Sequence, residues 1–257
     1  MSDVQTQPLL GGEHYSEPEA TSPGIGRTAS RWMVPLEAVS AVLTLGIIGL
    51  LLAAVLSRYV FASAIVWIDE VVSISFIWLT MIGAALAMHR NEHLRLSLMV
   101  DKLPARWQPF VHAFALTVVA AFLVGLLPSA VEYAQEEWFI KSPALDLPNT
   151  YRVASIPFGL GLMLLILMGY AWRTVPVKAL VSAVLLVGAT AALCHVLAPS
   201  LPALGSWNMV IFLVGVVAVC LMAGVPIAFC FGLGALSYLA FTTHVPLLIV
   251  VGRMDEG

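Results

Sequence analysis

Residues 67–96, "WIDEVVSISFIWLTMIGAALAMHRNEHLRL", decide how the whole chain is interpreted. The stretch opens with two adjacent carboxylates, Asp69 and Glu70, continues as a long apolar run, and closes with a cluster of His, Arg and Glu. A run of about 20 apolar residues is what a helix needs to cross the roughly 30 Å hydrocarbon core of a bilayer. The stretch therefore predicts a transmembrane helix with polar residues at its two water-facing ends.

The composition indicates that lipid, rather than water, surrounds most of this chain. Of its 257 residues, 60% are hydrophobic and only 11% are charged, whereas soluble domains carry about 25% charged residues. The mean hydropathy is +0.96. Because backbone groups in lipid must bond to one another, apolar runs of this length become helices. The net charge of −3 is small and indicates no nucleic-acid partner.

Seven apolar runs follow an N-terminal segment of different character. Residues 1–32 are rich in Pro, Gly, Ser, Thr and Glu, so we predict a disordered cytoplasmic tail without a cleaved signal. The predicted spans are 34–56, 68–88, 109–131, 153–170, 179–197, 209–223 and 227–241. We interpret the last two, which are short, as two spans rather than one span and a re-entrant piece. The predicted fold is all-α: a polytopic transmembrane helical bundle of about seven spans.

The basic residues predict the orientation of these spans. With the N-terminus in the cytoplasm, the inner face receives Arg27, Arg31, Arg90, Arg95, Lys102, Arg106, Arg173 and Lys178. The outer face receives Arg58, Lys141, Arg152 and Arg253. Because cytoplasmic loops carry an excess of Lys and Arg, this distribution favours a cytoplasmic N-terminus.

The acidic start of the second run is interpreted as an outer membrane interface and a helix cap. Anions at a helix N-terminus are favoured by about 0.3–1 kcal/mol, and Trp67 beside them suits the aromatic belt of a membrane protein. The sharper alternative is an ion or proton site. Asp69 and Glu70 are poorly placed to share one ligand, because adjacent residues point about 100° apart on a helix.

The other end of the run contains "HRNEH", which matches the H-x-x-E-H pattern of one metallopeptidase class. His89 and His93 are four residues apart and would share a helix face, as zinc ligands must. We nevertheless predict no metal site, because no other His-Glu pair offers a third ligand. No nucleophile elbow, phosphate loop or dinucleotide loop occurs either, so we predict no catalytic residue, no cofactor and no enzyme. An intramembrane metalloenzyme is kept as one alternative.

Small residues recur at four-residue spacing inside the runs. Gly83 and Ala87 form one pair, and Gly224, Ala228 and Gly232 form a triple. Such spacing lets helix backbones approach closely in lipid. Pro226 is expected to break the chain between the sixth and seventh runs.

At these residues the chain resembles the small (Q-type) permease subunit of the TRAP transporters, the tripartite ATP-independent periplasmic systems. In family order, the matching residues are Arg58, Tyr59, Val60, Phe61, Trp67, Asp69, Glu70, Trp78, 83–87, Arg90, His93 and Leu94. Residues 142–165 also resemble the segment entering the last small-subunit span. Ser97 stands where the family usually has an acidic residue.

From about residue 209 the chain resembles the start of the large (M-type) subunit, whose Gly-Val-Pro-Ile-Ala matches residues 224–228. The resemblance therefore implies a Q–M fusion. After the tail 1–32, we expect a four-span Q-type domain at 33–174. A linking transmembrane helix and outer loop at 175–208 then lead to an incomplete beginning of the M-type domain at 209–257.

The resemblance implies a scaffold subunit of a sodium-coupled, binding-protein-dependent uptake system for small organic acids in the bacterial inner membrane. The implied partners are the large permease subunit or its continuation, a periplasmic solute-binding protein and membrane lipid. The family's substrate and sodium sites lie in large-subunit hairpins beyond this sequence, so none is assigned here. The candidate structural residues are Arg58, Trp67, Asp69, Glu70, Trp78, Gly83, Arg90, His93, Gly224, Pro226 and Gly232.

One alternative belongs to a different functional class: a membrane structural or assembly protein with no transport activity of its own. It is favoured because the chain lacks paired charges deep within a span, which transporters commonly carry.

Overall fold

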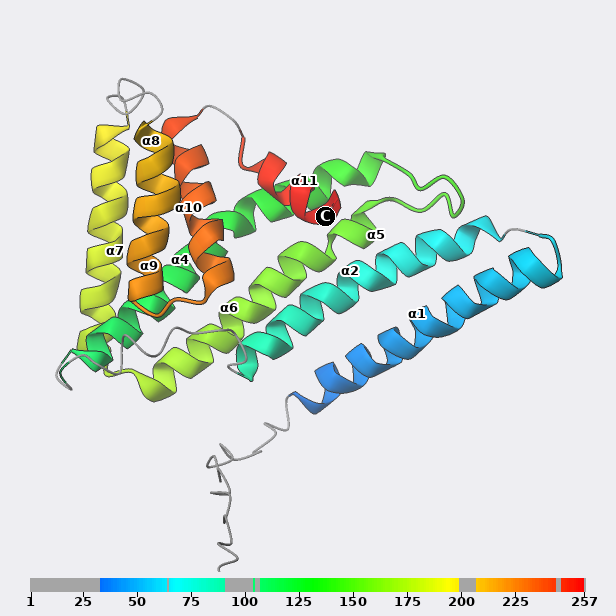
Figure 1. Ribbon diagram of the computed structural model, residues 1–257, viewed down its shortest axis with the longest axis horizontal. Coiled ribbons are helices and arrows are strands. Elements are labelled where there is room, and N and C mark those ends of the chain that lie inside the picture. The colour runs from blue at the N-terminus through cyan, green and yellow to red at the C-terminus, as the bar shows by residue number, and fades with distance from the viewer. Residues whose placement is uncertain are drawn as a thin grey trace, which may run out of the picture.

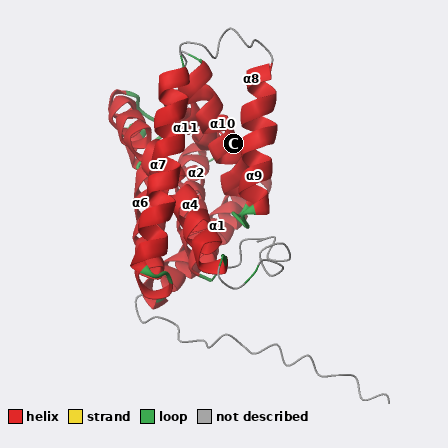
Figure 2. Ribbon diagram, turned by 90° about the vertical axis from the view of Figure 1, so that its left-hand side faces the viewer, coloured by secondary structure: helices red, strands yellow, loops and turns green. Residues whose placement is uncertain are grey.

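The computed structural model describes residues 33–63, 65–90, 104, 107–198, 207–243 and 246–256, which form a bundle of helices (Figures 1 and 2). The elements are α1 (Val34–Val60), α2 (Val66–His89), α4 (Gln108–Glu136), η1 (Glu137–Phe139), α5 (Thr150–Val153), α6 (Ser155–Thr174), α7 (Val177–Leu197), α8 (Trp207–Val210), η3 (Ile211–Val216), α9 (Val217–Met222), α10 (Ile227–Thr242) and α11 (Leu248–Glu256). The all-α helical bundle is confirmed. The tail predicted at 1–32 lies outside the described residues.

The predicted apolar runs coincide closely with these helices. Within the described residues, five helices are long and apolar enough to cross a membrane: Val34–Val60, Val66–His89, Gln108–Phe139, Thr150–Thr174 and Val177–Leu197. The sixth and seventh runs form helices of 16 residues each. At 1.5 Å per residue these measure about 24 Å, which is shorter than the roughly 30 Å core. The helices support a multi-pass membrane protein, with five of the seven predicted spans at full length.

The helices pack in a lateral order that differs from their order in the chain. Helix α1 packs on α2, α2 on α6, α6 on α4, and α4 on α7 (Figure 1). Helix α4 also contacts α10 and α11, which makes it the centre of the bundle. Helices α1 and α7 lie at the edges of the bundle. In each of them only 6% of the most apolar 18-residue segment is buried, whereas the buried share is 39% in α4 and in α5–α6. The exposed apolar faces of the edge helices are therefore suited to contact lipid.

Close packing between α2 and α6 depends on a glycine. A Cβ atom at Gly159 would lie 2.6 Å from Cε and 2.8 Å from Cβ of Met81. Both distances are shorter than real carbon contacts, and Cβ of Met81 cannot move without the backbone of α2. Gly159 is thus the position at which α6 accepts the Met81 side chain of α2.

The turn between α9 and α10 also follows from its residues. Gly224 has a φ of 77°, a left-handed conformation that glycine adopts at no steric cost. The N–H of Val225 donates to the carbonyl of Cys220 at 3.0 Å, which closes the end of α9. Pro226 then stands directly before α10, as expected of a chain break. Gly224 therefore shapes the turn, while Gly232 contacts α4: a Cβ there would lie 2.9 Å from the Phe122 ring.

We predict that Gly159→Ala lowers the stability of the protein in detergent. The added methyl group collides with Met81, and overpacking of this kind costs about 1–3 kcal/mol. The measurement is the midpoint of unfolding, monitored by the loss of the helical circular dichroism signal. Gly161→Ala is the matched control, because a Cβ at Gly161 meets nothing within 4 Å. Equal midpoints for the two variants would contradict the packing described here.

Candidate functional site

Glu70 anchors a loop at one end of the bundle. This end, named the Glu70 end, is where α1 stops, α2 begins and α4 leads through η1 and residues 140–149 into α5 (Figure 1). The two carboxylate oxygens of Glu70 accept hydrogen bonds from the backbone N–H groups of Ala144 at 2.6 Å and Leu145 at 2.8 Å. The N-cap of α2 is Ile65, which makes no side-chain cap bond. The capping interpretation is therefore wrong for Glu70, which holds the 140–149 loop instead.

The 140–149 loop is built from further hydrogen bonds of its own. The N–H of Asn149 donates to the carbonyl of Ile140 at 2.8 Å, and its side-chain amide donates to Glu137 Oε2 at 2.6 Å. Lys141 and Asp146 form an exposed ion pair at 3.1 Å. These bonds define the shape of the loop, and the two bonds to Glu70 attach the loop to α2.

Trp78 ties the middle of α2 to the start of the α5–α6 segment. Its indole Nε1–H donates to the carbonyl of Tyr151 at 2.9 Å, and its ring lies 5.4 Å from the Phe158 ring. The sequence resemblance selected Trp78 without indicating this partner. Two other candidates, Arg58 in the last turn of α1 and Trp67 in the first turn of α2, also lie at the Glu70 end.

A second polar contact at the Glu70 end joins α5 to α11. The guanidinium of Arg152 makes two hydrogen bonds to the carboxylate of Asp255, one of them from Nε to Oδ1 at 3.1 Å. The Asp255 side chain is only 2% exposed and that of Arg152 is 28% exposed. Removing one partner of a buried pair leaves an uncompensated charge, so this contact matters more for stability than a surface pair.

Sequence reasoning missed the contact between Arg152 and Asp255. From the sequence, Arg152 was assigned only to the basic residues of the outer face. Helix α11 was not predicted, because its nine residues are too few to span a membrane. The available signal was the run 248–251 of apolar residues followed by the charged pair Arg253 and Asp255. A continuous apolar run this short fits either a buried helix segment or a strand, so the signal did not specify a helix.

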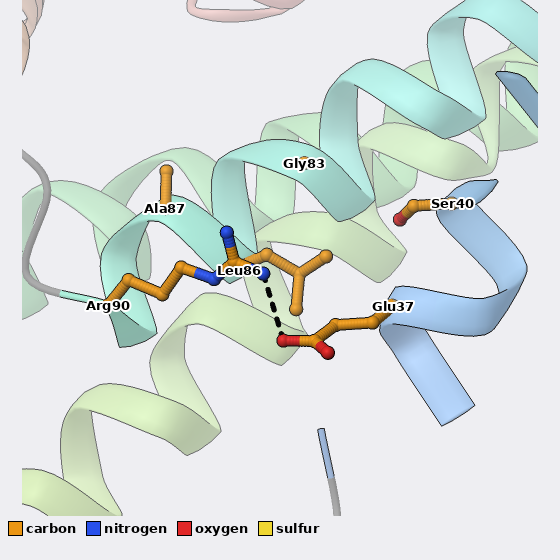
Figure 3. A pocket seen from close by; sticks show the side chains of 6 residues that line it. All are labelled: Glu37, Ser40, Gly83, Leu86, Ala87 and Arg90. Atoms are coloured by element: carbon orange, nitrogen blue, oxygen red, sulfur yellow. Dashed lines mark hydrogen bonds and ion pairs between the residues drawn. The ribbon is translucent and has the colours of Figure 1, made fainter. Parts of the chain in front are cut away.

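The opposite end of the bundle, named the Arg90 end, carries an ion pair between α1 and α2. Arg90 Nη2 lies 2.9 Å from Glu37 Oε1, and both side chains are about half exposed (Figure 3). Exposed pairs of this kind contribute about 0–1 kcal/mol. Ser40, Gly83, Leu86 and Ala87 line a groove beside the pair (Figure 3).

Gly83 does not mediate close helix packing. A Cβ at this position would meet nothing within 4 Å, so the predicted tight approach is wrong here and Gly83 opens the groove instead. His89 is the last residue of α2. His93 lies outside the described residues, and a zinc-ligand pair with His89 is thus untested.

Taken together, the polar contacts of the described residues link helices and loops at the two ends of the bundle. Glu70 and Arg152 do so at one end, and Arg90 does so at the other.

The sequence matches the family model of the DctQ component of the tripartite ATP-independent periplasmic transporters over residues 47–177. This segment is half of the chain and includes α2, α4, α5 and α6. The chain therefore belongs to the DctQ family of TRAP transporter small permease components.

Individual relatives agree with this assignment. The isethionate TRAP transporter permease protein DctMQ of Oleidesulfovibrio alaskensis is 29% identical over 193 residues, which cover 72% of this chain and 29% of that protein. The C4-dicarboxylate TRAP transporter small permease protein DctQ of Vibrio cholerae is 24% identical over 49% of this chain and 65% of its own. The sialic acid TRAP transporter permease protein SiaT of Haemophilus influenzae is 30% identical over 34% of this chain and 14% of its own.

The chain thus spans less than a third of the length of the DctMQ and SiaT permease proteins, 29% and 14% respectively. The DctMQ match covers 72% of the chain and so includes residues outside the DctQ segment 47–177. The resemblance to a small permease subunit joined to an M-type part, predicted from the sequence, is confirmed. The domain boundaries at 32, 174 and 208 stay predictions.

We predict that Glu70→Gln loosens the 140–149 loop. The amide keeps one acceptor oxygen, so one of the two N–H groups at Ala144 and Leu145 loses its partner. Hydrogen bonds to charged groups contribute about 1.5–3 kcal/mol, so exchange of that amide should rise about tenfold or more. Hydrogen–deuterium exchange read by mass spectrometry measures this change. Asp69→Asn is the matched control, and equal exchange in both variants would refute the anchoring role.

We predict that Arg152→Ala releases α11 from the bundle. The substitution leaves the Asp255 carboxylate buried and unpaired, which costs about 3–5 kcal/mol. Hydrogen exchange of the α11 amides should increase strongly. The double variant Arg152→Ala/Asp255→Ala should regain part of the lost protection, because it leaves no unpaired charge. Lys141→Ala, which breaks an exposed pair, should leave α11 unchanged. Protection of α11 in the Arg152→Ala protein would contradict the docking described here.

Proposed function

We propose that this chain is the scaffold subunit of a TRAP uptake system in the bacterial inner membrane. The system takes up small organic acids, is driven by sodium and depends on a binding protein. The match of residues 47–177 to the DctQ component carries this proposal. The chain anchors the transport subunit in the bilayer and has no catalytic residue and no cofactor. Sodium acts as the coupling ion of the complex and is bound outside this chain.

The names of the relatives support the substrate class. Isethionate, C4-dicarboxylates and sialic acid, named for three relatives, all carry an anionic acid group. Their different sizes and acid groups leave the individual substrate of the present system open within this class.

The arrangement of the bundle supports the assignment of faces. The Arg90 end carries Arg90, Arg173 near the end of α6 and Lys178 at the start of α7, which suits the cytoplasmic side. The Glu70 end then faces the periplasm, with its anchored 140–149 loop and α11. We propose that this end helps dock the solute-binding protein, and that the large permease subunit, or the continuation of the M-type part, packs beside the bundle.

The test is deletion of the gene in its native cells, with uptake of labelled isethionate, C4-dicarboxylate and sialic acid measured with and without a sodium gradient. We expect loss of sodium-dependent uptake of one acid and its return when the gene is restored. Affinity purification of the tagged chain from native membranes should recover a large TRAP permease and a solute-binding protein.

One outcome would overturn the proposal, and a second would remove only its sodium coupling. Unchanged uptake of every organic acid tested, together with no TRAP partner in the purified material, would favour the membrane assembly protein instead. If the uptake that disappears with the gene does not depend on the sodium gradient in wild-type cells, the scaffold role stands and the sodium coupling is removed from the proposal.

A further inference from the structure

The groove beside Glu37 and Arg90 has features that a simple ion pair between helices does not need. It lies between α1 and α2 at the Arg90 end, where Figure 3 shows its lining side chains, has a volume of about 290 Å³, and is shallow and largely open. This volume is close to the lower end of small-molecule sites, about 300 Å³. The groove is therefore large enough to hold a small polar group.

The walls of the groove explain why it stays open. Gly83 and Ala87 present almost no side chain, and a Cβ at Gly83 would meet nothing within 4 Å. Leu86 is nearly buried and lines the groove from α2. Because only 6% of the most apolar segment of α1 is buried, the seam between α1 and α2 lies at the exposed edge of the bundle.

The two charges lie at the ends of long apolar helices. Glu37 is in the first turn of α1, and Arg90 is the C-cap of α2. In a bilayer, the ends of spanning helices lie near the lipid headgroups. Their side chains keep 42% and 50% of their surface exposed although they contact each other at 2.9 Å. Each side chain thus keeps about half of its surface exposed while the pair is formed.

We propose that this groove binds the headgroup of a zwitterionic phospholipid of the phosphatidylethanolamine type. The Arg90 guanidinium pairs with the lipid phosphate, because its planar fork matches phosphate oxygens. The Glu37 carboxylate accepts from the lipid ammonium group. The site has one positive and one negative group side by side, which complements a headgroup with the same two charges. The inference goes beyond the scaffold function and requires only that the chain lies in a membrane.

An ion pair acting only as a link between α1 and α2 would behave differently. Exposed pairs add little to stability because water and salt screen them. Such a link would not depend on the empty space at Gly83. A larger side chain at Gly83 therefore separates the two roles: it fills the groove and leaves both charges in place.

The experiment measures which lipid the full chain retains. The protein is reconstituted in nanodiscs of equal phosphatidylethanolamine and phosphatidylglycerol and then transferred to detergent. Retained lipid per protein is measured by mass spectrometry. We expect preferential retention of phosphatidylethanolamine. Glu37→Gln should reduce it about tenfold, since losing one charged hydrogen bond corresponds to about that factor. Gly83→Leu should reduce it at least as much, because the added side chain occupies the space of the headgroup.

Gly46→Leu is the matched control. Gly46 lies on α1 outside the groove, has open space at its Cβ position, and should retain lipid like the wild type. Ser40→Leu fills the groove from the α1 side and serves as a second test if Gly83→Leu folds poorly by circular dichroism and size-exclusion chromatography. Among the residues that the structure describes, the Ser40 hydroxyl donates to the carbonyl of Leu36 in its own helix, at 3.0 Å.

Three results would overturn the proposal. Wild-type retention in folded Gly83→Leu and Ser40→Leu proteins would show that the groove holds no lipid. Lipid loss in Glu37→Gln without loss in the groove-filling variants would assign the pair to helix linkage alone. Equal retention of phosphatidylethanolamine and phosphatidylglycerol would mark the bound lipid as nonspecific.

Discussion

Backbone hydrogen bonding in lipid is the constraint on which the rest of this structure depends. A peptide group in the hydrocarbon core has no water to bond with, so each long apolar run forms a helix irrespective of its neighbours. This is why α1 is a helix of 27 residues although only 6% of its apolar window is buried by protein. Charged side chains of the described residues then lie near helix ends and in loops, where they make the contacts of the Glu70 and Arg90 ends, whereas interior hydroxyls such as that of Thr117 bond to a carbonyl of their own helix.

The helices were predictable because the signal is local. Hydropathy over about 20 residues predicts a span without knowledge of what it contacts. The polar contacts were not predictable in this way, because their partners are distant in the chain. Glu70 bonds to residues 74 and 75 positions away, and Arg152 bonds to a residue 103 positions away. Only the packing order of α2, α6 and α4 brings these groups together.

Small residues illustrate the same limit. Four-residue spacing correctly indicated helices that pack, yet it did not identify which glycine makes the tight contact. The space beside Gly83 is open. Gly159, which was not among the small residues predicted at four-residue spacing, is the glycine that contacts Met81. The outcome depends on the side chain that each neighbouring helix presents, and this requires the rotation of both helices. Gly232 did meet α4, through the Phe122 ring.

The pairing of Arg152 with Asp255 has a consequence for how the protein is made. The two residues are 103 positions apart, and a ribosome adds about 5–20 residues per second. Arg152 thus reaches the membrane on the order of ten seconds before its carboxylate partner exists. Until α11 has been made, the guanidinium of Arg152 lacks the carboxylate that pairs with it in the finished structure. The buried contact therefore forms late in biogenesis.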